Sequence, residues 1–457
     1  MQREGSIKKN RVLIKTAIAI GLFFTSFSPS ALAQDQHSYE SENIQDKYRY
    51  YRKKLKSDFL VIGSEQGKSL PIVIRNKWGG NAAAWGDATV HLGWYLGVLG
   101  TENYLLSSSN RKNELTENYQ ELYYAMFALQ RLDNIAESHP SSQKAAALNS
   151  KYRNYKPQNI LNGYFSRDDV PADFILNNPS LNESNTAEKK VTEVQSDWNQ
   201  SGTNHEMSKD QVVHLLMGLK LIWKYLPDNM IRIEDGNKTV EINFKNWAEQ
   251  LAAQILNITI SKKKIINPVT QKLVRRGNLT NDIIYPLTRL KNEFKAGGKK
   301  AKHLYTSYTI WTGYKKIAHM KVDNLHMVMT LGSITPSTIS RKLISKKADV
   351  QNWAPFYELL YDVVNNAPTR NYKRALTMLM EAPKYGLNHN MPSITNENKL
   401  HTGWECPNRF IKVQSAQEKG WAPASRSPNE RMNGYFNGLD FMLLHNLYAI
   451  QSRLKLQ

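Results

Sequence analysis

The sequence predicts an all-α fold in which helical hairpins pack around one axis and close into a ring. The segment from Ala88 to Leu106 is apolar on nearly all sides, whereas the segment from Leu115 to Glu137 carries one apolar stripe. More amphipathic segments, separated by polar loops, recur along the rest of the chain. A closed ring of hairpins buries its inner helices on every side and its outer helices on one side, so these two segments are predicted to be an inner and an outer helix.

The first 33 residues have the three-part layout of a secretory signal peptide. A basic stretch precedes an apolar run from Thr16 to Phe27, and the small residues Ala31-Leu32-Ala33 follow. The apolar run is shorter than the roughly 20 residues that cross a bilayer, and Pro29 interrupts its continuation. We therefore expect cleavage after Ala33, export to the periplasm or the extracellular space, and one helical domain over residues 34–457 without a transmembrane segment.

The charge of the chain points to acidic partners. The full sequence has a net charge of +21, of which the first 33 residues supply +4, so the mature chain retains +17. Such an excess favours polyanions, including acidic polysaccharides, anionic surface polymers and nucleic acid. The basic and tyrosine-rich run YRYYRKKLK at residues 48–56 could contact nucleic acid, but a helix with its aromatic side packed inward is the preferred interpretation.

The first two long helices are expected to form an antiparallel hairpin. Asp87 stands at the N-cap position of the first, and three glycines within it permit close approach of a neighbouring helix, namely Gly93, Gly97 and Gly100. The second helix has apolar residues at alternating spacings of four and three, and the polar stretch from Ser107 to Asn113 forms the turn.

Loops and helices alternate over the remainder. Residues 139–206 and 388–433 are predicted to be rich in loops, a strong helix begins after Ser208, and the sequence DGNK predicts the turn of a short hairpin within residues 231–244. Further helices are predicted at residues 247–258, 303–320, 351–365, 372–381 and 435–454.

Four segments resemble elements of a known class of protein. These are WGDATVHLGWYLGVLGTENYLL, NGYFSRDDVPADF, MSKDQVVHLLMGLKL and GYFNGLDFMLLHNLYAI. They are similar to parts of secreted bacterial (α/α)-toroid proteins associated with carbohydrate degradation. The resemblance implies a toroid with long loops at one mouth, where loops and the first turns of the inner helices build the active cleft.

Arg167, Asp168 and Asp169 form the sharpest candidate for chemistry. Glycoside hydrolysis needs one protonated carboxyl to assist the leaving oxygen and one ionised carboxylate to activate water or attack the sugar. Repulsion between adjacent aspartates can raise the pKa of one, while an arginine keeps the other ionised. The alternative is that Asp169 only caps a short helix beginning at Val170-Pro171.

Asp210 is the predicted catalytic partner of Asp168 and Asp169. It lies at the start of the helix that follows Ser208, close in sequence to Glu206 and one turn before His214. A structural alternative exists here too, because Ser208 and Gln211 have the spacing of a capping box and Asp210 would complement the helix dipole.

A wider group of residues is predicted to bind the substrate. Tryptophans in polar, loop-like surroundings can stack against sugar rings, although aromatic residues are more often part of a core. The predicted substrate-binding residues are Arg167, Glu206, His214, His389, Trp85, Trp198 and Trp404.

The sequence therefore favours an exported glycoside hydrolase acting on an acidic poly- or oligosaccharide. One alternative is a polysaccharide lyase, for which Asn388, His389 and Asn390 offer suitable side chains unless they only form a turn. Another is a non-catalytic protein that binds an acidic glycan or cell-surface polymer. Motifs for nucleotide, cofactor and metal binding are missing, and Cys406 is the single cysteine, so neither a cofactor nor a metal is expected.

Overall fold

Helices account for most of the chain that the computed structural model describes, as predicted, and the strands form only small sheets. The described residues are 43–63, 67–72, 74–75, 83–85, 87–137, 161–167, 169–170, 174–177, 206–261, 263–294, 322–335, 354–367, 372–382 and 435–456. Residues 43–54 are helical and continue into the π-helix η1 (Leu55–Phe59). The α-helices that follow are α2 (Ala88–Ser108), α3 (Lys112–Ile135), α5 (Phe174–Asn177), α6 (Lys209–Tyr225), α7 (Phe244–Ile260), α8 (Asn281–Glu293), α10 (Val322–Ile334), α12 (Ala354–Asn365), α13 (Tyr372–Glu381) and α15 (Leu439–Leu456).

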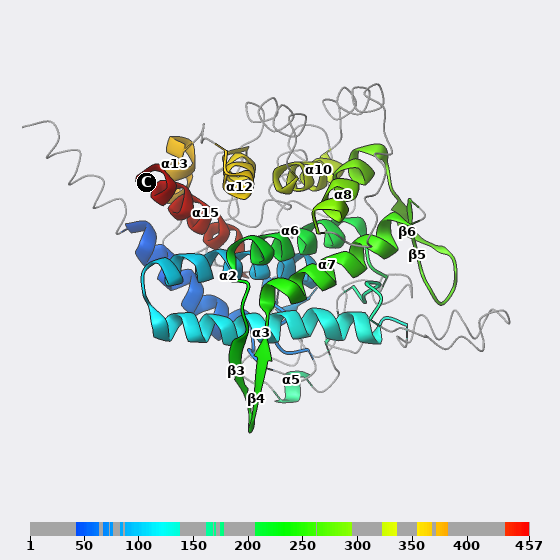
Figure 1. Ribbon diagram of the computed structural model, residues 1–457, viewed down its shortest axis with the longest axis horizontal. Coiled ribbons are helices and arrows are strands. Elements are labelled where there is room, and N and C mark those ends of the chain that lie inside the picture. The colour runs from blue at the N-terminus through cyan, green and yellow to red at the C-terminus, as the bar shows by residue number, and fades with distance from the viewer. Residues whose placement is uncertain are drawn as a thin grey trace, which may run out of the picture. The chain divides into compact units, whose positions relative to one another are not determined.

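The contrast in burial between α2 and α3 confirms the prediction made from their apolar patterns. Of the 21 residues of α2, 16 are buried, whereas only 10 of the 24 residues of α3 are buried. The two helices are joined by the predicted polar turn and pack against each other, and Figure 1 shows α3 alongside α2 and α7 alongside α6. Packing on all sides is possible for α2 because other helices cover its remaining faces.

Glycines bring the backbones of α2 and α6 into direct contact. A Cβ atom added at Gly93 would lie 2.3 Å from the carbonyl oxygen of His214, and one at Gly218 would lie 2.3 Å from the carbonyl oxygen of Gly93. Further along, a Cβ at Gly100 would lie 3.0 Å from the nitrogen of Ile222. The starts of the two helices therefore meet each other, as do their ends, and α2 and α6 run in the same direction.

Helix α12 also follows this direction. Trp94, near the start of α2, stacks on Phe356, near the start of α12, with ring centroids 4.9 Å apart. At the far end of α6, the Tyr225 hydroxyl donates to the carbonyl oxygen of Val363, near the end of α12, at 3.0 Å. Packing connects α2 to α6, α6 to α10, α10 to α12, α12 to α15 and α15 to α2. Helices α3, α7, α8 and α13 pack against members of this set.

The short strands tie helix starts together. Strands β1 (Ile74–Arg75), β2 (Ala83–Ala84) and β7 (Tyr435–Phe436) form an antiparallel sheet in the order β2-β1-β7. Because β2 ends shortly before α2 and β7 ends shortly before α15, this sheet holds the starts of both helices at one end. Here one prediction was wrong: residues 435–436 are a strand rather than helix, since Gly438 has a φ of 71° and α15 begins only after it.

Two further hairpins complete the described strands. Strands β3 (Ile231–Asp235) and β4 (Lys238–Ile242) pair across a turn at Gly236, as the DGNK sequence predicted. Strands β5 (Lys264–Ile266) and β6 (Leu273–Asn278) were not predicted, and neither were α8 and α10. The helix predicted at residues 303–320 lies outside the described residues.

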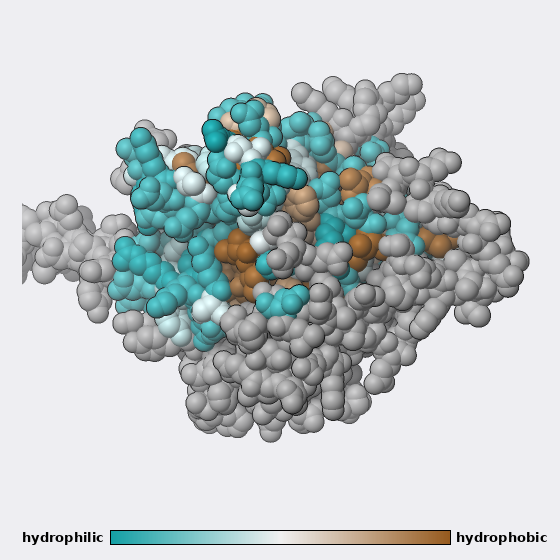
Figure 2. Space-filling view, turned by 90° about the horizontal axis from the view of Figure 1, so that it is seen from below, coloured by the Kyte–Doolittle hydropathy of each residue, from teal (hydrophilic) through white to brown (hydrophobic). Residues whose placement is uncertain are grey.

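Hydrophilic side chains cover most of the described surface on the face shown in Figure 2, with smaller hydrophobic areas between them. The large apolar side chains gather inside, where they form one extended core. Within the described part of the chain, no helix combines the length and the apolar character needed to cross a membrane.

Candidate functional site

A loop containing the predicted catalytic motif lies against the starts of α2 and α6. Ser166 forms an isolated antiparallel bridge with Glu206, just before α6, and the Arg167 guanidinium forms an ion pair with Asp87, just before α2. The structure thus brings Arg167 and Glu206, two of the predicted substrate-binding residues, into one region. We call this region, residues 161–170 together with the starts of α2 and α6, the mouth.

Asp87 has a different role from the one predicted. It occupies the N-cap position of α2, but its side chain makes no capping hydrogen bond. Its backbone is left-handed, with a φ of 71°, and its carboxylate binds Arg167 instead. The ion pair thereby links the loop to the start of α2.

The end of α3 holds the loop through the carboxylate of Asp133. Its two oxygens accept the backbone N–H groups of Asn162, at 3.2 Å, and Gly163, at 2.9 Å. The Ser166 N–H donates to the carbonyl oxygen of Leu132 at 2.8 Å. Burial raises the pKa of Asp133 to about 7, although the two backbone hydrogen bonds act in the opposite direction.

Glu137 is a second buried carboxyl beside the same loop. The Asn162 amide donates to its Oε1 at 2.6 Å, while its Oε2 is buried and has no hydrogen-bond partner among the described residues. Burial raises its pKa to about 7. Burial raises the pKa of Tyr164 most, and the negative charges of Glu206 and Glu137 raise it further. Both carboxyls therefore lie near this phenol.

Replacing Glu137 by glutamine is expected to remove a pH-dependent loss of stability. An acid with a raised pKa keeps its proton in the folded state at pH values where the unfolded chain has already released it. The contribution of this carboxyl to the free energy of unfolding therefore falls as pH rises from about 4.5 to 7, and it stays constant at higher pH. Urea unfolding measures the loss of unfolding free energy between pH 5 and pH 8, and this loss should be ~2 kcal/mol smaller in Glu137→Gln than in the wild type. Glu117→Gln, which alters a glutamate of α3 that is 69% exposed, serves as the control and should behave like the wild type. An unchanged pH dependence in Glu137→Gln would contradict this assignment.

Asp169 is fully enclosed by contacts at the mouth. Its side chain is 1% exposed, and Arg131 donates to its carbonyl oxygen at 2.9 Å and to its Oδ2 at 2.6 Å. The side chain therefore joins the loop to α3 through an ion pair. Asp168 lies outside the described residues, so its predicted role stays a prediction.

The start of α6 carries the predicted capping box. The side chain of Gln211 accepts the Ser208 N–H at 3.0 Å, and the Ser208 hydroxyl donates to Asp210. Asp210 and Glu206 are both partly exposed, and the Asn267 amide donates to Glu206 Oε1 at 2.8 Å. These contacts orient two carboxylates at the start of α6 without enclosing them.

The other predicted substrate-binding residues have different surroundings. His214 is completely buried, accepts a hydrogen bond from Trp94 and lies against His326. Trp85 is 2% exposed, packs edge-on against Phe174 and belongs to the core. Trp198, His389 and Trp404 lie outside the described residues.

Sequence reasoning overlooked three residues that shape the mouth: Arg131, Asp133 and Glu137. A signal for the two acids was present, because they follow Leu129 at spacings of four, with Asp133 on the inward stripe of α3 and Glu137 just after the helix ends. Acidic residues within an apolar stripe are expensive to bury without a partner, which marks them as sites of specific contacts.

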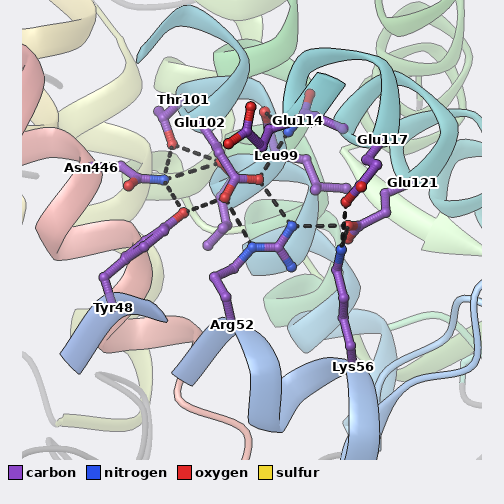
Figure 3. A network of polar contacts seen from close by, with 12 residues as sticks. Tyr48, Arg52, Lys56, Leu99, Thr101, Glu102, Glu114, Glu117, Glu121 and Asn446 are labelled. Atoms are coloured by element: carbon purple, nitrogen blue, oxygen red, sulfur yellow. Dashed lines mark hydrogen bonds and ion pairs between the residues drawn. The ribbon is translucent and has the colours of Figure 1, made fainter. Parts of the chain in front are cut away.

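A second polar cluster lies at the other end of α2 (Figure 3). Arg52, from the first helix, donates to both oxygens of Glu102 on α2, at 2.9 and 3.0 Å, and to Glu121 on α3, at 3.0 Å. Lys56 adds an ion pair with Glu121 at 2.6 Å, and Tyr48 donates to Glu102 at 2.7 Å. A pocket of about 590 Å³ lies beside this network, and none of the predicted site residues lines it.

The chemistry of this network differs from what acid catalysis requires. Burial favours a raised pKa for Glu121, but Arg52 and Lys56 outweigh it and lower that pKa, so the carboxylate is ionised at neutral pH. A general acid must carry a proton at the working pH. The network therefore joins the first helix to α2 and α3, and the run YRYYRKKLK has this structural role. Tyr51 in the same run packs inward against Phe441, as predicted.

Comparison of the chain with protein-family models, with curated proteins and with solved structures gave no match. Among the described residues, no three histidine, cysteine, aspartate or glutamate side chains are grouped in a way that could hold a metal ion. The function must therefore be inferred from the geometry of the mouth and from the sequence.

Proposed function

We propose that the described helices belong to an (α/α) toroid. The order of packing supports this proposal, because the contacts that lead from α2 through α6, α10, α12 and α15 return to α2. The shared direction of α2, α6 and α12 is a second argument, since it gathers their starts at one end. A ring of parallel inner helices with other helices outside is the arrangement that the sequence resemblance implies.

Within this fold, we propose that the chain is an exported glycoside hydrolase that acts on an acidic poly- or oligosaccharide. The observation that carries the proposal is the position of the loop with Arg167 and Asp169, which contacts both Asp87 before α2 and Glu206 before α6. Two helix starts and one loop, each carrying acidic residues, thereby lie together, and two-carboxylate hydrolysis needs two such acids in one site. The net charge of +17 after residue 33 favours an acidic polymer, and the signal-like layout of residues 1–33 supports export.

The contacts suggest a division of roles among the acids. Asp210 and Glu206 keep exposed surface and are oriented by neutral donors, which suits them to contact substrate. Asp169 is enclosed by Arg131, which suits it to position the loop so that its neighbour Asp168 can act as the second catalytic carboxyl. Arg167 is paired with Asp87 but keeps some exposed surface, so its guanidinium can also donate a hydrogen bond to the carboxylate of an acidic sugar.

A screen against acidic and neutral polysaccharides tests the proposal. Purified protein of residues 34–457 should release reducing ends from at least one polymer, and Asp168→Asn and Asp210→Asn should each lower turnover by about 100-fold or more, because an amide cannot transfer the catalytic proton. Asp46→Asn, which alters an aspartate on the first helix with a side chain 52% exposed, should keep full activity. Circular dichroism and thermal unfolding would show that the variants remain folded.

Three outcomes would overturn the proposal. Full activity in both variants would remove the mouth as the catalytic site. Release of unsaturated products instead of hydrolytic ends would favour a lyase, for which the sequence offers His389. Binding of an acidic polymer without turnover would favour a non-catalytic binding protein.

A further inference from the structure

The segment between α7 and α8 carries a concentrated positive charge. Residues 261–278 contain six lysines and arginines and no aspartate or glutamate, so they contribute +6 to the charge of +17 that remains after residue 33. We call residues 261–278 the basic hairpin. It includes β5 and β6, and Figure 1 shows both strands beyond the end of α7.

Four cations of the basic hairpin are exposed and lack a counter-charge. None of them forms an ion pair within the part of the chain that the structure describes, and they are Lys263, Lys264, Lys272 and Arg276. Elsewhere, the exposed arginines Arg49, Arg111 and Arg232 each pair with an acid two or three positions away. Like charges that are gathered without a counter-charge repel one another and attract an anionic partner. The basic hairpin is therefore a candidate surface for a polyanion.

The backbone beneath these cations is held in place. Ile265, Val269 and Val274 are at most 2% exposed and anchor the basic hairpin to the core. Oδ1 of Asn267 accepts the backbone N–H groups of Val269, at 2.9 Å, and Thr270, at 3.1 Å, which fixes the turn between the strands. An anion that binds here meets a preformed surface and need not order the backbone first.

A bulge in β6 presents Arg276 at the surface. Lys264 on β5 pairs with Asn278 on β6. Two positions later on β5, Ile266 pairs with Leu273, which is five positions earlier on β6. The extra residues of β6 include Arg276, whose side chain is exposed and whose backbone is left-handed, with a φ of 58°. Glycine would adopt this conformation without strain, and bulges often re-aim a side chain beside a functional site. The backbone alone therefore gives no reason for an arginine at this position.

The basic hairpin borders the mouth through two hydrogen bonds. Asn267, in the turn between the strands, donates to Glu206 Oε1 at 2.8 Å. At the end of β6, the carbonyl oxygen of Asn278 accepts from Nζ of Lys209, the first residue of α6, at 3.3 Å. The hairpin thus lies directly beside the start of α6.

The positive surface continues to the start of α6. Burial lowers the pKa of Lys209, Asp282 and Asp210 raise it, and the positive charge of Arg276 lowers it further. Arg276 therefore lies close to the first residue of α6. The acids at the mouth repel an anionic substrate, and a neighbouring row of cations offsets this repulsion and draws a polyanion toward them.

We propose that the basic hairpin binds the acidic groups of a polysaccharide chain whose reacting part lies in the mouth. Its four exposed cations contact carboxylate or sulfate groups of sugar units beyond the one that reacts. The inference rests on the proposed glycoside hydrolysis, which it deepens by assigning these outer units to a separate surface. An acidic glycan fits better than single-stranded nucleic acid, because residues 261–278 contain no aromatic ring on which bases could stack.

Binding measurements with labelled oligogalacturonate and sulfated dextran test the surface directly. The hairpin variant, in which the four exposed cations are replaced together by glutamine, should bind at least one of these probes about 10-fold or more weakly than the wild type, the combined effect of four exposed charge contacts. Its binding should also depend less on salt concentration. Neutral dextran should bind equally to both proteins.

A charge-matched control separates a specific surface from net charge. It replaces four exposed lysines on other elements by glutamine, namely Lys53, Lys112, Lys238 and Lys373. This control variant should bind the acidic probes nearly as well as the wild type. Equal weakening in the hairpin variant and the control variant, or no binding of either acidic probe by the wild type, would overturn the proposal.

Arg276→Gly separates binding from folding. Glycine relieves the left-handed backbone, so the midpoint of thermal unfolding should not fall. Binding to the acidic probe should weaken about 2- to 5-fold, because one exposed charge contact is lost. A lower midpoint with unchanged binding would show that the arginine serves the fold, and would overturn its role in the surface.

Kinetics distinguishes this inference from the proposed hydrolysis. On an acidic polymer that the wild type turns over, the hairpin variant should raise KM and leave kcat nearly unchanged, since contacts outside the reacting unit bind substrate and transition state equally. Binding at the basic hairpin without turnover would support the surface and overturn the hydrolase. Turnover with an unchanged KM in the hairpin variant would overturn the surface alone. Single-stranded DNA that binds more tightly than the acidic probes, and is lost in the hairpin variant, would overturn the glycan as the partner.

Discussion

Replacing Arg52 by methionine is expected to destabilise the protein by about 3–5 kcal/mol, the range found when one partner of a buried ion pair is removed. The guanidinium joins the carboxylates of Glu102 and Glu121, whose side chains are 13% and 3% exposed. Without it, two carboxylates remain close together in a partly buried site, and Lys56 compensates only Glu121. Urea unfolding monitored by circular dichroism measures the loss.

Two comparisons make this test specific. Arg49→Met alters an arginine of the same helix that is 73% exposed and pairs weakly with Asp46, so its effect should stay within about 0.5 kcal/mol. Adding Glu102→Gln and Glu121→Gln to Arg52→Met removes the uncompensated charges and should restore a large part of the stability. An Arg52→Met variant as stable as Arg49→Met would show that the network contributes little.

The helices that the sequence predicted best are those with local and repeated signals. Burial on all sides of α2 follows from its continuous apolar composition, and the single buried face of α3 follows from its spacing. The capping box at Ser208 and the turn at Gly236 are equally local, and both are present. Prediction failed at residues 435–436, because the strand there depends on pairing with Ile74 and Arg75, more than 300 positions away.

The candidate site was predicted only where its residues are close in sequence. The motif at Arg167 to Asp169 was identified, but its ion pairs with Asp87 and Arg131 join segments about 80 and 38 positions apart. No periodicity indicates such pairs. The same reason explains why the His214 partner His326 was missed, since neither residue forms a motif alone and their contact requires α6 and α10 to be packed side by side.

Close contact between α2 and α6 connects stability with the proposed site. Gly93 precedes Trp94 directly, and its nearest neighbour across the interface is the carbonyl group of His214. Any separation of the helices at this point must also move the indole of Trp94 relative to the imidazole of His214, which are 3.1 Å apart. The glycine contact therefore determines whether the hydrogen bond from Trp94 to His214 can form.

Gly93→Ala is accordingly expected to cost about 1–3 kcal/mol or more in stability, even though alanine favours a helix by about 1 kcal/mol over glycine. The added Cβ would lie 2.3 Å from a backbone oxygen that cannot turn aside, so the two helices must move apart. Gly97→Ala is the matched control on the same helix, because its new Cβ would meet side chains, the nearest being Leu221 at 3.1 Å, and side chains can adjust.

Gly218→Ala affects the same contact from the other helix, so the double variant with Gly93→Ala should cost less than the sum of the two single changes. Urea unfolding ranks the four variants, and ¹⁵N-histidine spectra should show the His214 tautomer disturbed in Gly93→Ala and unchanged in Gly97→Ala. Equal stabilities for Gly93→Ala and Gly97→Ala would mean that the backbones of α2 and α6 are not in contact, and the hydrogen bond from Trp94 to His214 would then lose its structural basis.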